Sequence, residues 1–429
     1  MKKLSPIFSF ILFFQFSLFA QNGWENVAPS DTLPGLLGIY ALDSQNVWVI
    51  GQEGTILNTT NSGVAWNEIN SPVTYSLYNV HFINADTGWI GGDNGTITEI
   101  IRTTNRGSSW ELKTLAASDY GNYDIEFTDG GTGDPPRGFV TAGRSLVWRT
   151  DDYGNNWGTT GIDGGCGAGD LQSICFIDKN EGWFVGTPAL GSEVTIVHTT
   201  DGGQTYDIQT NPTDPDIKLN CVSFATDQQG IAVGLAGTIL YTSDGGQNWE
   251  IRPYNSDSWT SVSLNQSGKA WAVGYTGNIA YSTDWGYTWT AQQSGVTCVL
   301  WEVFFVNDDE GWIVGGGIGQ PGVILHTTSG GVVTGIDDNK IVKEFMLYQN
   351  YPNPFNPATK IKYSIPNRSL VTLKVLDILG KEIITLINEE KSAGTYELTW
   401  NAANLPSGVY FYKIKAGNYV SVKKMILIK

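Results

Sequence analysis

The chain has 429 residues, which is enough for two or more domains, and a formal net charge of −17 at pH 7. Its 52 glycines are matched by 52 aromatic residues, a composition typical of turn-rich β structure packed by large side chains. Only three histidines are present, which argues against a His-rich metal centre, and the acidic balance argues against nucleic acid and anionic membranes as partners.

The first 20 residues have the pattern of a secretory signal peptide. Lys2 and Lys3 precede an apolar run over residues 4–19, and the small residue Ala20 stands before the predicted cleavage site. A transmembrane helix is the weaker alternative, because polar residues and a proline interrupt a run that is already shorter than the ~20 residues of a span. No later segment is apolar for long enough to cross a bilayer, so we expect export without a transmembrane span.

Residues 21–334 are organised around an eight-residue unit, which is clearest as Thr-Ser-Asp-Gly-Gly-Gln-Asn-Trp at residues 242–249. Six further copies, the last one degenerate, make a chance run of hairpins the weaker explanation. Aligned on Gly63, Gly107, Gly154, Gly203, Gly246, Gly286 and Gly331, they lie 40–49 residues apart, the period of a blade array. In six of the units an Asn or Asp can hold a turn, the glycine allows positive φ, and an aromatic residue starts the next strand. These structural positions are Asn61 and Trp66, Asn105 and Trp110, Asp152 and Trp157, Asp201 and Tyr206, Asp244 and Trp249, and Asp284 and Trp289.

Each repeat also contains four short apolar or alternating stretches. In the second repeat these are residues 77–83, 88–92, 96–104 and 110–113, and four strands per repeat predict the blade of a β-propeller. Seven first strands can be counted, near Leu37, Tyr78, Tyr123, Leu171, Leu219, Trp259 and Trp301. We therefore expect seven blades.

The two ends of the repeat region complement each other. The seventh repeat has Thr334 where the aromatic residue should stand, and no fourth strand follows it. Residues 23–27, Gly-Trp-Glu-Asn-Val, look like a fourth strand without a blade. We expect this N-terminal strand to complete the last blade, because ring closure removes two exposed sheet edges.

One face of the predicted propeller is the candidate ligand face. If the eight-residue units join the third and fourth strands, they all lie on the other face, and the ligand face carries loops of variable length. Exposed Tyr and Trp would suit a sugar ring or a protein hot spot, with packing between blades as the alternative for each of them. The candidate ligand-face residues are Glu53, Tyr75, Asp93, Arg144, Glu193, Trp259, Tyr275 and Trp301.

Four cysteines, Cys166, Cys175, Cys221 and Cys298, lie in the later repeats. They allow three complete disulfide pairings, and free buried thiols are the alternative. Their spacings are unlike those of zinc sites, and we expect neither a metal site nor a cofactor.

The eight-residue unit resembles the Asp-box repeat, Ser/Thr-x-Asp-x-Gly-x-x-Trp, of sialidases and other propellers, in which the box is structural. Second strands of the form Gly-Trp-x-Val-Gly, at residues 88–92, 182–186 and 311–315, are similar to the photosystem II assembly and stability factor family. This resemblance implies the fold but not the photosystem partner. The plant and cyanobacterial members of this family present a basic patch, whereas this propeller has 10 basic and 34 acidic residues. The nearest counterpart of that patch in this sequence is the cluster Arg137, Arg144 and Arg149.

No catalytic residues are predicted. A sialidase needs three converging arginines, but Arg102 and Arg149 precede their boxes on the wrong face, and the Phe/Tyr-Arg-Ile-Pro motif is absent. A binding or scaffolding protein is therefore the first hypothesis. A secreted glycoside hydrolase is the alternative, because 34 carboxylates contain many pairs.

The composition changes after residue 334. Residues 335–344 form a polar linker, and residues 345–429 contain 11 basic and 5 acidic residues. Six alternating strands with Gly or Pro turns predict a small Ig-like β-sandwich. The sequence thus predicts an all-β protein, a seven-bladed β-propeller with a C-terminal Ig-like β-sandwich.

This C-terminal module resembles the type A sorting domain of the type IX secretion system in Bacteroidetes-like bacteria, through Tyr351-Pro-Asn-Pro-Phe-Asn-Pro, residues 377–381, 405–411 and 423–429. The resemblance implies export through the periplasm to the outer cell surface or the medium. The implied partners are the secretion machinery and a surface sortase, and the ligand can be a surface glycan or a protein. An ordinary Ig-like binding module is the alternative. The motif residues are Pro352, Asn353, Pro354, Gly380, Gly408, Lys423 and Lys424.

Overall fold

The structure, a computed structural model, describes residues 23–94, 98–116, 123–128, 135–160, 168–188, 196–213, 217–252, 254–317, 319–332, 345–366, 369–391, 394–417 and 419–429. The predicted signal peptide with its cleavage site at Ala20, the linker 335–344 and Glu193 lie outside these residues. The chain forms two compact units, Met1–Val332 and Val333–Lys429. Within the described ranges, none of the helical segments is long and apolar enough to cross a membrane.

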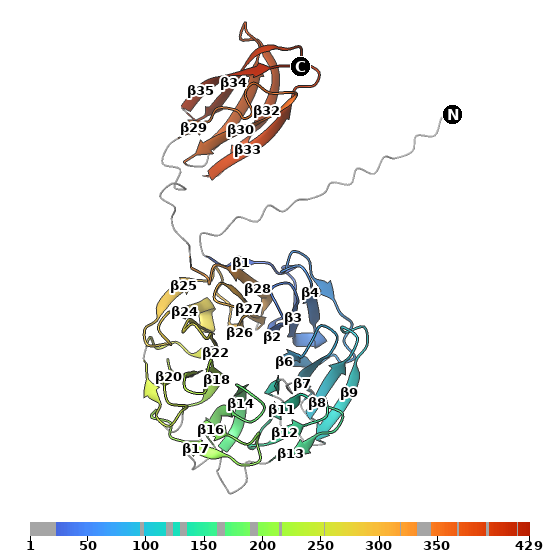
Figure 1. Ribbon diagram of the computed structural model, residues 1–429, viewed down its shortest axis with the longest axis vertical. Helices are drawn as coiled ribbons and strands as arrows, with labels where there is room; N and C mark the ends of the chain where they lie inside the picture. Colours follow the sequence, from blue (N-terminus) through green and yellow to red (C-terminus); the bar gives the residue numbers. More distant parts are fainter. Residues whose placement is uncertain are drawn as a thin grey trace, which may run out of the picture. The chain divides into compact units, whose positions relative to one another are not determined.

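In the first unit the described residues form seven four-stranded antiparallel sheets, which are arranged in a ring (Figure 1). In six of them the strands follow one another from the centre of the ring outwards. The first sheet has β2 (Leu36–Ala41), β3 (Val47–Gly51), β4 (Ile56–Thr59) and β5 (Asn67–Glu68), and the second has β6 (Ser76–Phe82), β7 (Gly88–Asp93), β8 (Thr98–Thr103) and β9 (Glu111–Ala116). The third has β10 (Asp124–Thr128), β11 (Arg137–Thr141), β12 (Val147–Thr150) and β13 (Gly158–Thr159), and the fourth has β14 (Ala168–Phe176), β15 (Gly182–Pro188), β16 (Ile196–Thr199) and β17 (Asp207–Gln209). The fifth has β18 (Leu219–Phe224), β19 (Gly230–Gly234), β20 (Ile239–Thr242) and β21 (Glu250–Ile251), and the sixth has β22 (Trp259–Leu264), β23 (Ala270–Gly274), β24 (Asn278–Ser282) and β25 (Thr290–Gln293).

The seventh sheet combines both ends of the unit. Its strands are β26 (Leu300–Phe305), β27 (Glu310–Gly317), β28 (Gln320–Thr328) and the N-terminal β1 (Glu25–Asn26). Glu25 pairs with His326 and Asn26 with Leu325, so the N-terminal strand supplies the outer strand of the last blade. Two short 3-10 turns, η1 (Gln52–Gly54) and η2 (Tyr275–Gly277), connect second and third strands.

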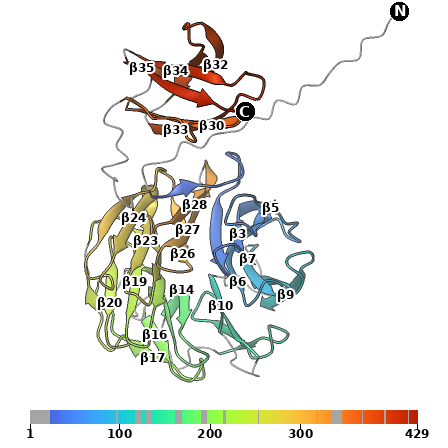
Figure 2. The ribbon, with the colours of Figure 1, turned by 45° about the horizontal axis from the view of Figure 1, so that its top comes forward.

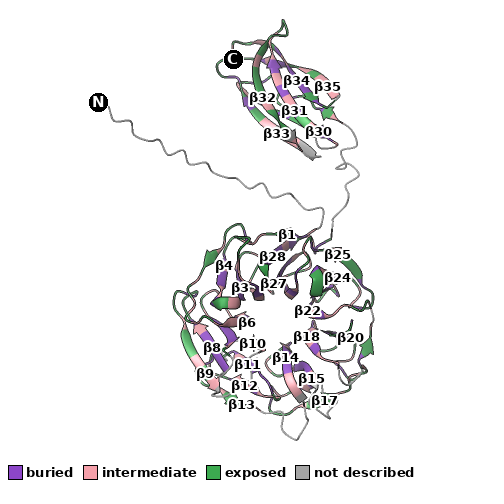
Figure 3. Cartoon of the chain, turned by 180° about the vertical axis from the view of Figure 1, so that it is seen from behind, coloured by how far each residue is buried: buried purple, intermediate pink, exposed green. Residues whose placement is uncertain are grey.

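Neighbouring blades are joined by stacked aromatic rings. The aromatic residue of a second strand lies flat on a phenylalanine at the end of the next blade's first strand, with ring centroids 3.5–4.2 Å apart in five such pairs. The pairs are Trp48–Phe82, Trp89–Phe127, Phe139–Phe176, Trp183–Phe224 and Trp271–Phe305. Five of the seven second strands place a glycine against the same phenylalanine, where a Cβ would come within 2.6 Å of the ring. The core of the ring therefore lies between the blades, and the outer strands are more exposed (Figure 3).

The eight-residue units, called Asp-boxes here after the repeat they resemble, join the third and fourth strands of the first six blades, and the seventh unit lies at the end of β28. In all seven, the backbone N–H of the box glycine donates to the hydroxyl of the first box residue, at 2.8–3.0 Å. The box aromatics pack edge-on against core rings, as Trp66 does on Trp312 and Trp110 on Trp48. Both contacts cross to the neighbouring blade, so the boxes are structural wedges.

The second unit is a two-layered β-sandwich (Figure 2). One sheet has the order β29 (Met346–Leu347), β30 (Ala358–Ile365) and β33 (Gly394–Asn401). The other has the order β32 (Glu382–Lys391), β31 (Ser369–Leu376), β34 (Gly408–Ala416) and β35 (Tyr419–Leu427). Alternate residues of these strands, among them Ile361, Leu373, Tyr412 and Met425, meet in one apolar core.

Candidate ligand-binding site

A cavity of about 520 Å³ lies at the centre of the propeller and receives side chains from all seven blades. It is lined by the beginnings of the first strands and the ends of the second strands, which lie on the face opposite the Asp-boxes. One residue from the same position in each blade lines it, and we call these seven the collar. The collar residues are Leu37, Tyr78, Tyr123, Gln172, Asn220, Thr260 and Trp301.

A β-bulge produces the collar in six of the seven blades. In the first blade, Leu36 pairs with Gly51 and Gly38 with Ile50, so Leu37 has no partner in the ladder. The same register shift occurs at the collar residues of the second, fourth, fifth, sixth and seventh blades. In the third blade Tyr123 directly precedes β10 and bonds Thr141 through its backbone N–H. Since a bulge re-aims a side chain that the ladder would otherwise fix, the repeat itself builds the cavity wall.

In five blades, the residue after the collar position belongs to a second ring of side chains that joins neighbouring blades. A carboxyl oxygen of Glu302 accepts the backbone N–H of Ile39 at 2.6 Å, which links the seventh blade to the first. Asp124, Ser173 and Ser261 accept the equivalent N–H groups of the next blades, and the Cys221 thiol lies 3.7 Å from the Val262 carbonyl oxygen. These bonds use the inner edges of the first strands and fix the backbone that carries the collar.

Burial controls the charge of this second ring. Desolvation raises the pKa of the Glu302 carboxyl to about 8 and that of Asp124 to about 6. Burial also lowers the pKa of Lys218, which lines the cavity near the collar. At neutral pH the Glu302 side chain is therefore mostly protonated, and Asp124 is mostly ionised.

The candidate ligand-face residues fall into four groups. Asp93, Tyr275 and Trp301 line the cavity, and the rings of Tyr275 and Trp301 meet at 6.3 Å. Glu53, Tyr75 and Arg144 are not among its lining residues; the Tyr75 hydroxyl instead donates to Glu99 at 2.8 Å. The expectation that Trp259 is an exposed binding residue is wrong, because its side chain is fully buried in the core between blades. The fourth group, Glu193, lies outside the described residues.

Several lining residues were not expected from the sequence. They include Tyr78, which is 42% exposed, together with Gln172, Lys218, Asn220 and Thr260. The signal that could have found them is positional: in six of the seven blades, the collar residue follows a leucine or a tryptophan near the start of the first strand. A comparison of this position across the repeats, rather than a search for exposed aromatics, gives all of the collar except Tyr123, which follows Asn122.

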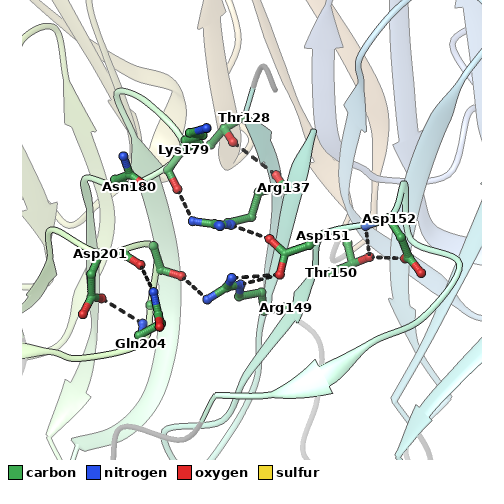
Figure 4. Close-up of polar contacts among 12 residues, drawn as sticks. Thr128, Arg137, Arg149, Thr150, Asp151, Asp152, Lys179, Asn180, Asp201 and Gln204 are labelled. Atoms are coloured by element: carbon green, nitrogen blue, oxygen red, sulfur yellow. Dashed lines mark hydrogen bonds and ion pairs between the residues drawn. The ribbon is translucent and has the colours of Figure 1, made fainter. Parts of the chain in front are cut away.

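The structure divides the predicted arginine cluster. Arg137 donates to the Lys179 carbonyl at 2.6 Å and Arg149 to the Gly202 carbonyl at 2.9 Å, so both reach from the third blade to the fourth (Figure 4). Asp151 accepts from both arginines. Arg144 instead lies between β11 and β12, on the face of the cavity. The three arginines are therefore not one patch, and two of them are structural.

The described cysteines are free thiols. Cys175 and Cys221 lie in neighbouring inner strands, and Cys298 is buried. Burial raises the pKa of Cys221 to about 11, so this thiol stays protonated at neutral pH. Cys166 lies outside the described residues, within which no group of three or more His, Cys, Asp or Glu side chains could hold a metal ion.

The repeats match one protein family over much of the propeller. The family described as Photosynthesis system II assembly factor YCF48 matches residues 64–164, 106–211, 168–257 and 207–291, which together span more than half of the chain. The chain belongs to the YCF48 family. Two solved YCF48 propellers share its fold and confirm the all-β propeller architecture. The structure described as "YCF48 bound to D1 peptide" has a TM-score of 0.57 and 20% identity, covering 72% of this chain and 97% of that one, and "YCF48 from Cyanidioschyzon merolae" has a TM-score of 0.55 and 18% identity, covering 71% and 98%.

Curated YCF48 relatives align over short segments. The Photosystem II assembly lipoprotein Ycf48 of Synechococcus sp. (strain CC9902) is 31% identical over 87 residues, which are 19% of this chain and 22% of the relative. The chloroplastic Photosystem II stability/assembly factor HCF136 of Guillardia theta is 26% identical over 86 residues, 20% of this chain and 22% of the relative. The chain thus spans about a fifth of the length of these curated relatives.

The C-terminal sandwich matches a second family, described as Secretion system C-terminal sorting domain, at residues 349–429. This YCF48 family member is therefore marked for export to the cell surface or for secretion by the type IX system. In the sandwich, Asn353 accepts the backbone N–H of Ile426 at 2.9 Å and donates to the Lys424 carbonyl at 3.3 Å. Pro352, Asn353 and Pro354 are thus brought to the strand of Lys423 and Lys424. Gly408 begins the neighbouring strand, and Gly380 lies in the turn between β31 and β32.

Proposed function

We propose that the exported propeller is a binding or scaffolding module that holds its ligand within the collar. The observation that carries this proposal is the convergence of one side chain from every blade on a single cavity of about 520 Å³. Cavities of this size, with aromatic walls and a few placed polar groups, are typical of ligand sites. The second-ring hydrogen bonds support the same view, because they hold the collar backbone in place before a ligand arrives.

Membership of the YCF48 family supports binding as the role of such a propeller. One family structure is described as bound to a D1 peptide, so a protein segment is one class of ligand to test. For the sorting domain, we propose that a surface sortase removes it by a cut before Phe345, in the predicted linker.

The proposal is tested with the purified full chain on arrays of oligosaccharides and of peptides. We expect ligands whose binding is lost in Trp301→Ala and in Tyr78→Ala. Tyr287→Ala is the matched control, because it removes an exposed tyrosine from an Asp-box on the opposite face. Ligands that bind both collar variants as well as they bind the wild type would place the site elsewhere and refute the proposal.

A panel of chromogenic glycosides distinguishes a binding protein from a glycoside hydrolase. Two carboxyls near the collar, Asp124 and Glu302, each hold a backbone N–H of the next blade, which is a structural use of both groups. We therefore expect binding without turnover. Turnover that is abolished by Asp124→Asn or Glu302→Gln would favour an enzyme instead.

A further inference from the structure

We propose that the ligand of the collar is an uncharged oligosaccharide. This inference rests on the proposed function and names the ligand class of the same site. It follows from how the seven collar residues divide around the cavity. The seventh, first, second and third blades contribute Trp301, Leu37, Tyr78 and Tyr123, and the fourth, fifth and sixth contribute Gln172, Asn220 and Thr260.

The aromatic half of the collar presents rings in fixed orientations. The Trp301 indole N–H donates to the Gly316 carbonyl at 2.9 Å, and the Tyr123 hydroxyl donates to Asp170 at 3.3 Å. These bonds occupy the polar tips of the rings. Tyr78 stands between them around the ring and is 42% exposed. Fixed aromatic faces of this kind suit the C–H face of a sugar ring, which stacks on them at little entropic cost.

The polar half of the collar carries amides and a hydroxyl. Asn220 uses its NH₂ group to donate to the Trp259 carbonyl at 2.7 Å, which orients its carbonyl oxygen as a remaining acceptor. Gln172 makes no side-chain hydrogen bond to any part of the chain that the structure describes, although it lines the cavity. An amide both donates and accepts, as sugar hydroxyls do, so this half suits the edge of the sugar.

The charges around the collar disfavour an anionic ligand. The collar has no acidic or basic residue, and burial keeps Glu302 below it mostly protonated at neutral pH. The other charged residues that line the cavity are Asp93, Asp124 and Lys218, so acidic side chains outnumber basic ones around it. The propeller as a whole carries 34 acidic and 10 basic residues, a field that repels uronic and sialic acids.

An extended peptide is disfavoured by the inner strand edges. A peptide that adds to a sheet needs backbone groups on an exposed edge. In the propeller, the N–H groups of Ile39, Ile174 and Val222 on these edges already donate to second-ring side chains of the preceding blades. Recognition is therefore left to the collar side chains.

The test is isothermal titration of the full chain at pH 7 with three probes: uncharged hexose oligosaccharides of mixed linkage, oligogalacturonate, and the peptides selected on the array. We expect binding of an uncharged oligosaccharide, and affinity for oligogalacturonate at least about tenfold weaker. Tyr78→Ala and Gln172→Ala should each weaken binding by about tenfold, which is about 1.4 kcal/mol. Tyr287→Ala and Gln228→Ala, which remove the same side-chain types on the opposite face, should leave it unchanged.

The outcomes separate this inference from the proposed function. Peptide or oligogalacturonate binding that is lost in the collar variants would overturn the oligosaccharide assignment and leave the site in place. Failure of every uncharged oligosaccharide to bind would also overturn it. Binding that none of the collar variants affects would overturn both.

Discussion

Trp24 packs edge-on against Phe305, with ring centroids 5.8 Å apart and an interplanar angle of 87°. The same arrangement joins the box residue Trp249 to Phe224, at 5.8 Å and 89°. Trp24 comes from the N-terminal strand, yet it takes the position that the last Asp-box leaves without an aromatic residue. Its indole N–H also donates to Gln292 of the sixth blade at 2.9 Å.

Removal of Trp24 should therefore destabilise the whole ring. We expect Trp24→Ala to lower the free energy of unfolding by about 3–5 kcal/mol, as is usual for a buried tryptophan. Deletion of residues 21–27 should cost at least as much, because it also removes the pairing with β28. Urea denaturation measures both, with the exposed Val64→Ala as control. Unchanged unfolding of the deletion would show that β1 does not hold the ring closed.

The glycines of the second strands should be intolerant of a side chain. A Cβ on Gly311 would lie 2.4 Å from the Phe305 ring, which is itself stacked on Trp271 at 3.5 Å. We expect Gly311→Ala to cost about 1–3 kcal/mol through overpacking. Gly158→Ala is the matched control, because nothing lies within 4 Å of its Cβ position. Equal thermal unfolding of the two variants would contradict the account of the interblade core.

Glu302 should make the stability of the propeller fall as the pH rises. Burial raises its pKa from 4.5 to about 8, so the folded state prefers the proton. The stability it contributes is complete below about pH 4.5 and is lost as the pH approaches 8. Glu302→Gln keeps an acceptor for Ile39 and should raise Tm at pH 8.5 by at least about 2 °C, with a much smaller change at pH 4. The exposed Glu68→Gln is the control, and an equal shift at both pH values would refute this role.

Asp151 should stabilise the folded propeller most at pH values above the pKa of its carboxyl group. Partial burial opposes its ionisation, but hydrogen bonds from Arg137 and Arg149 outweigh this and lower the pKa from 3.8. A lowered pKa stabilises the folded state above about pH 3.8 and ceases to do so as the pH falls. Asp151→Asn should therefore cost about 1 kcal/mol in urea denaturation at pH 7, and the difference should shrink towards pH 2. A constant difference would assign the effect to packing.

Export should depend on the C-terminal sandwich. A chain that ends at Gly335 keeps the propeller and lacks the residues that match the sorting domain. We expect it to accumulate in the periplasm, as fractionation and immunoblotting of the expressing cells would show. Asn353→Ala, which removes the contacts with Ile426 and Lys424, should reduce secretion of the full chain. Normal secretion of the truncated chain would refute the export route.

The repeated features of the sequence predict the blades, but they do not predict which side chains the β-bulges turn towards the cavity. The Asp-boxes mark the blades in the sequence because each box makes its own local hydrogen bonds, and six of the seven also carry their own aromatic wedge residue. Trp259 and Trp301 both lie near the start of a first strand, yet Trp259 is buried and Trp301 lines the cavity. Trp259 pairs within the ladder just before the bulge of its strand, whereas Trp301 is itself the bulged residue. Tyr78 and Gln172 were overlooked for the same reason. Likewise Arg137 and Arg144 are close along the chain, but the strand between them puts them on opposite faces.

The pairing of Glu25 with His326 has a consequence for the order of folding. During synthesis Glu25 is made before all seven blades, and its partner strand β28 exists only after six blades and the first two strands of the seventh have been made. Until then the ring is an open arc with two bare edges. The ring therefore closes only after the last blade has been made, and β1, the first strand along the chain, is among the last to find its partner.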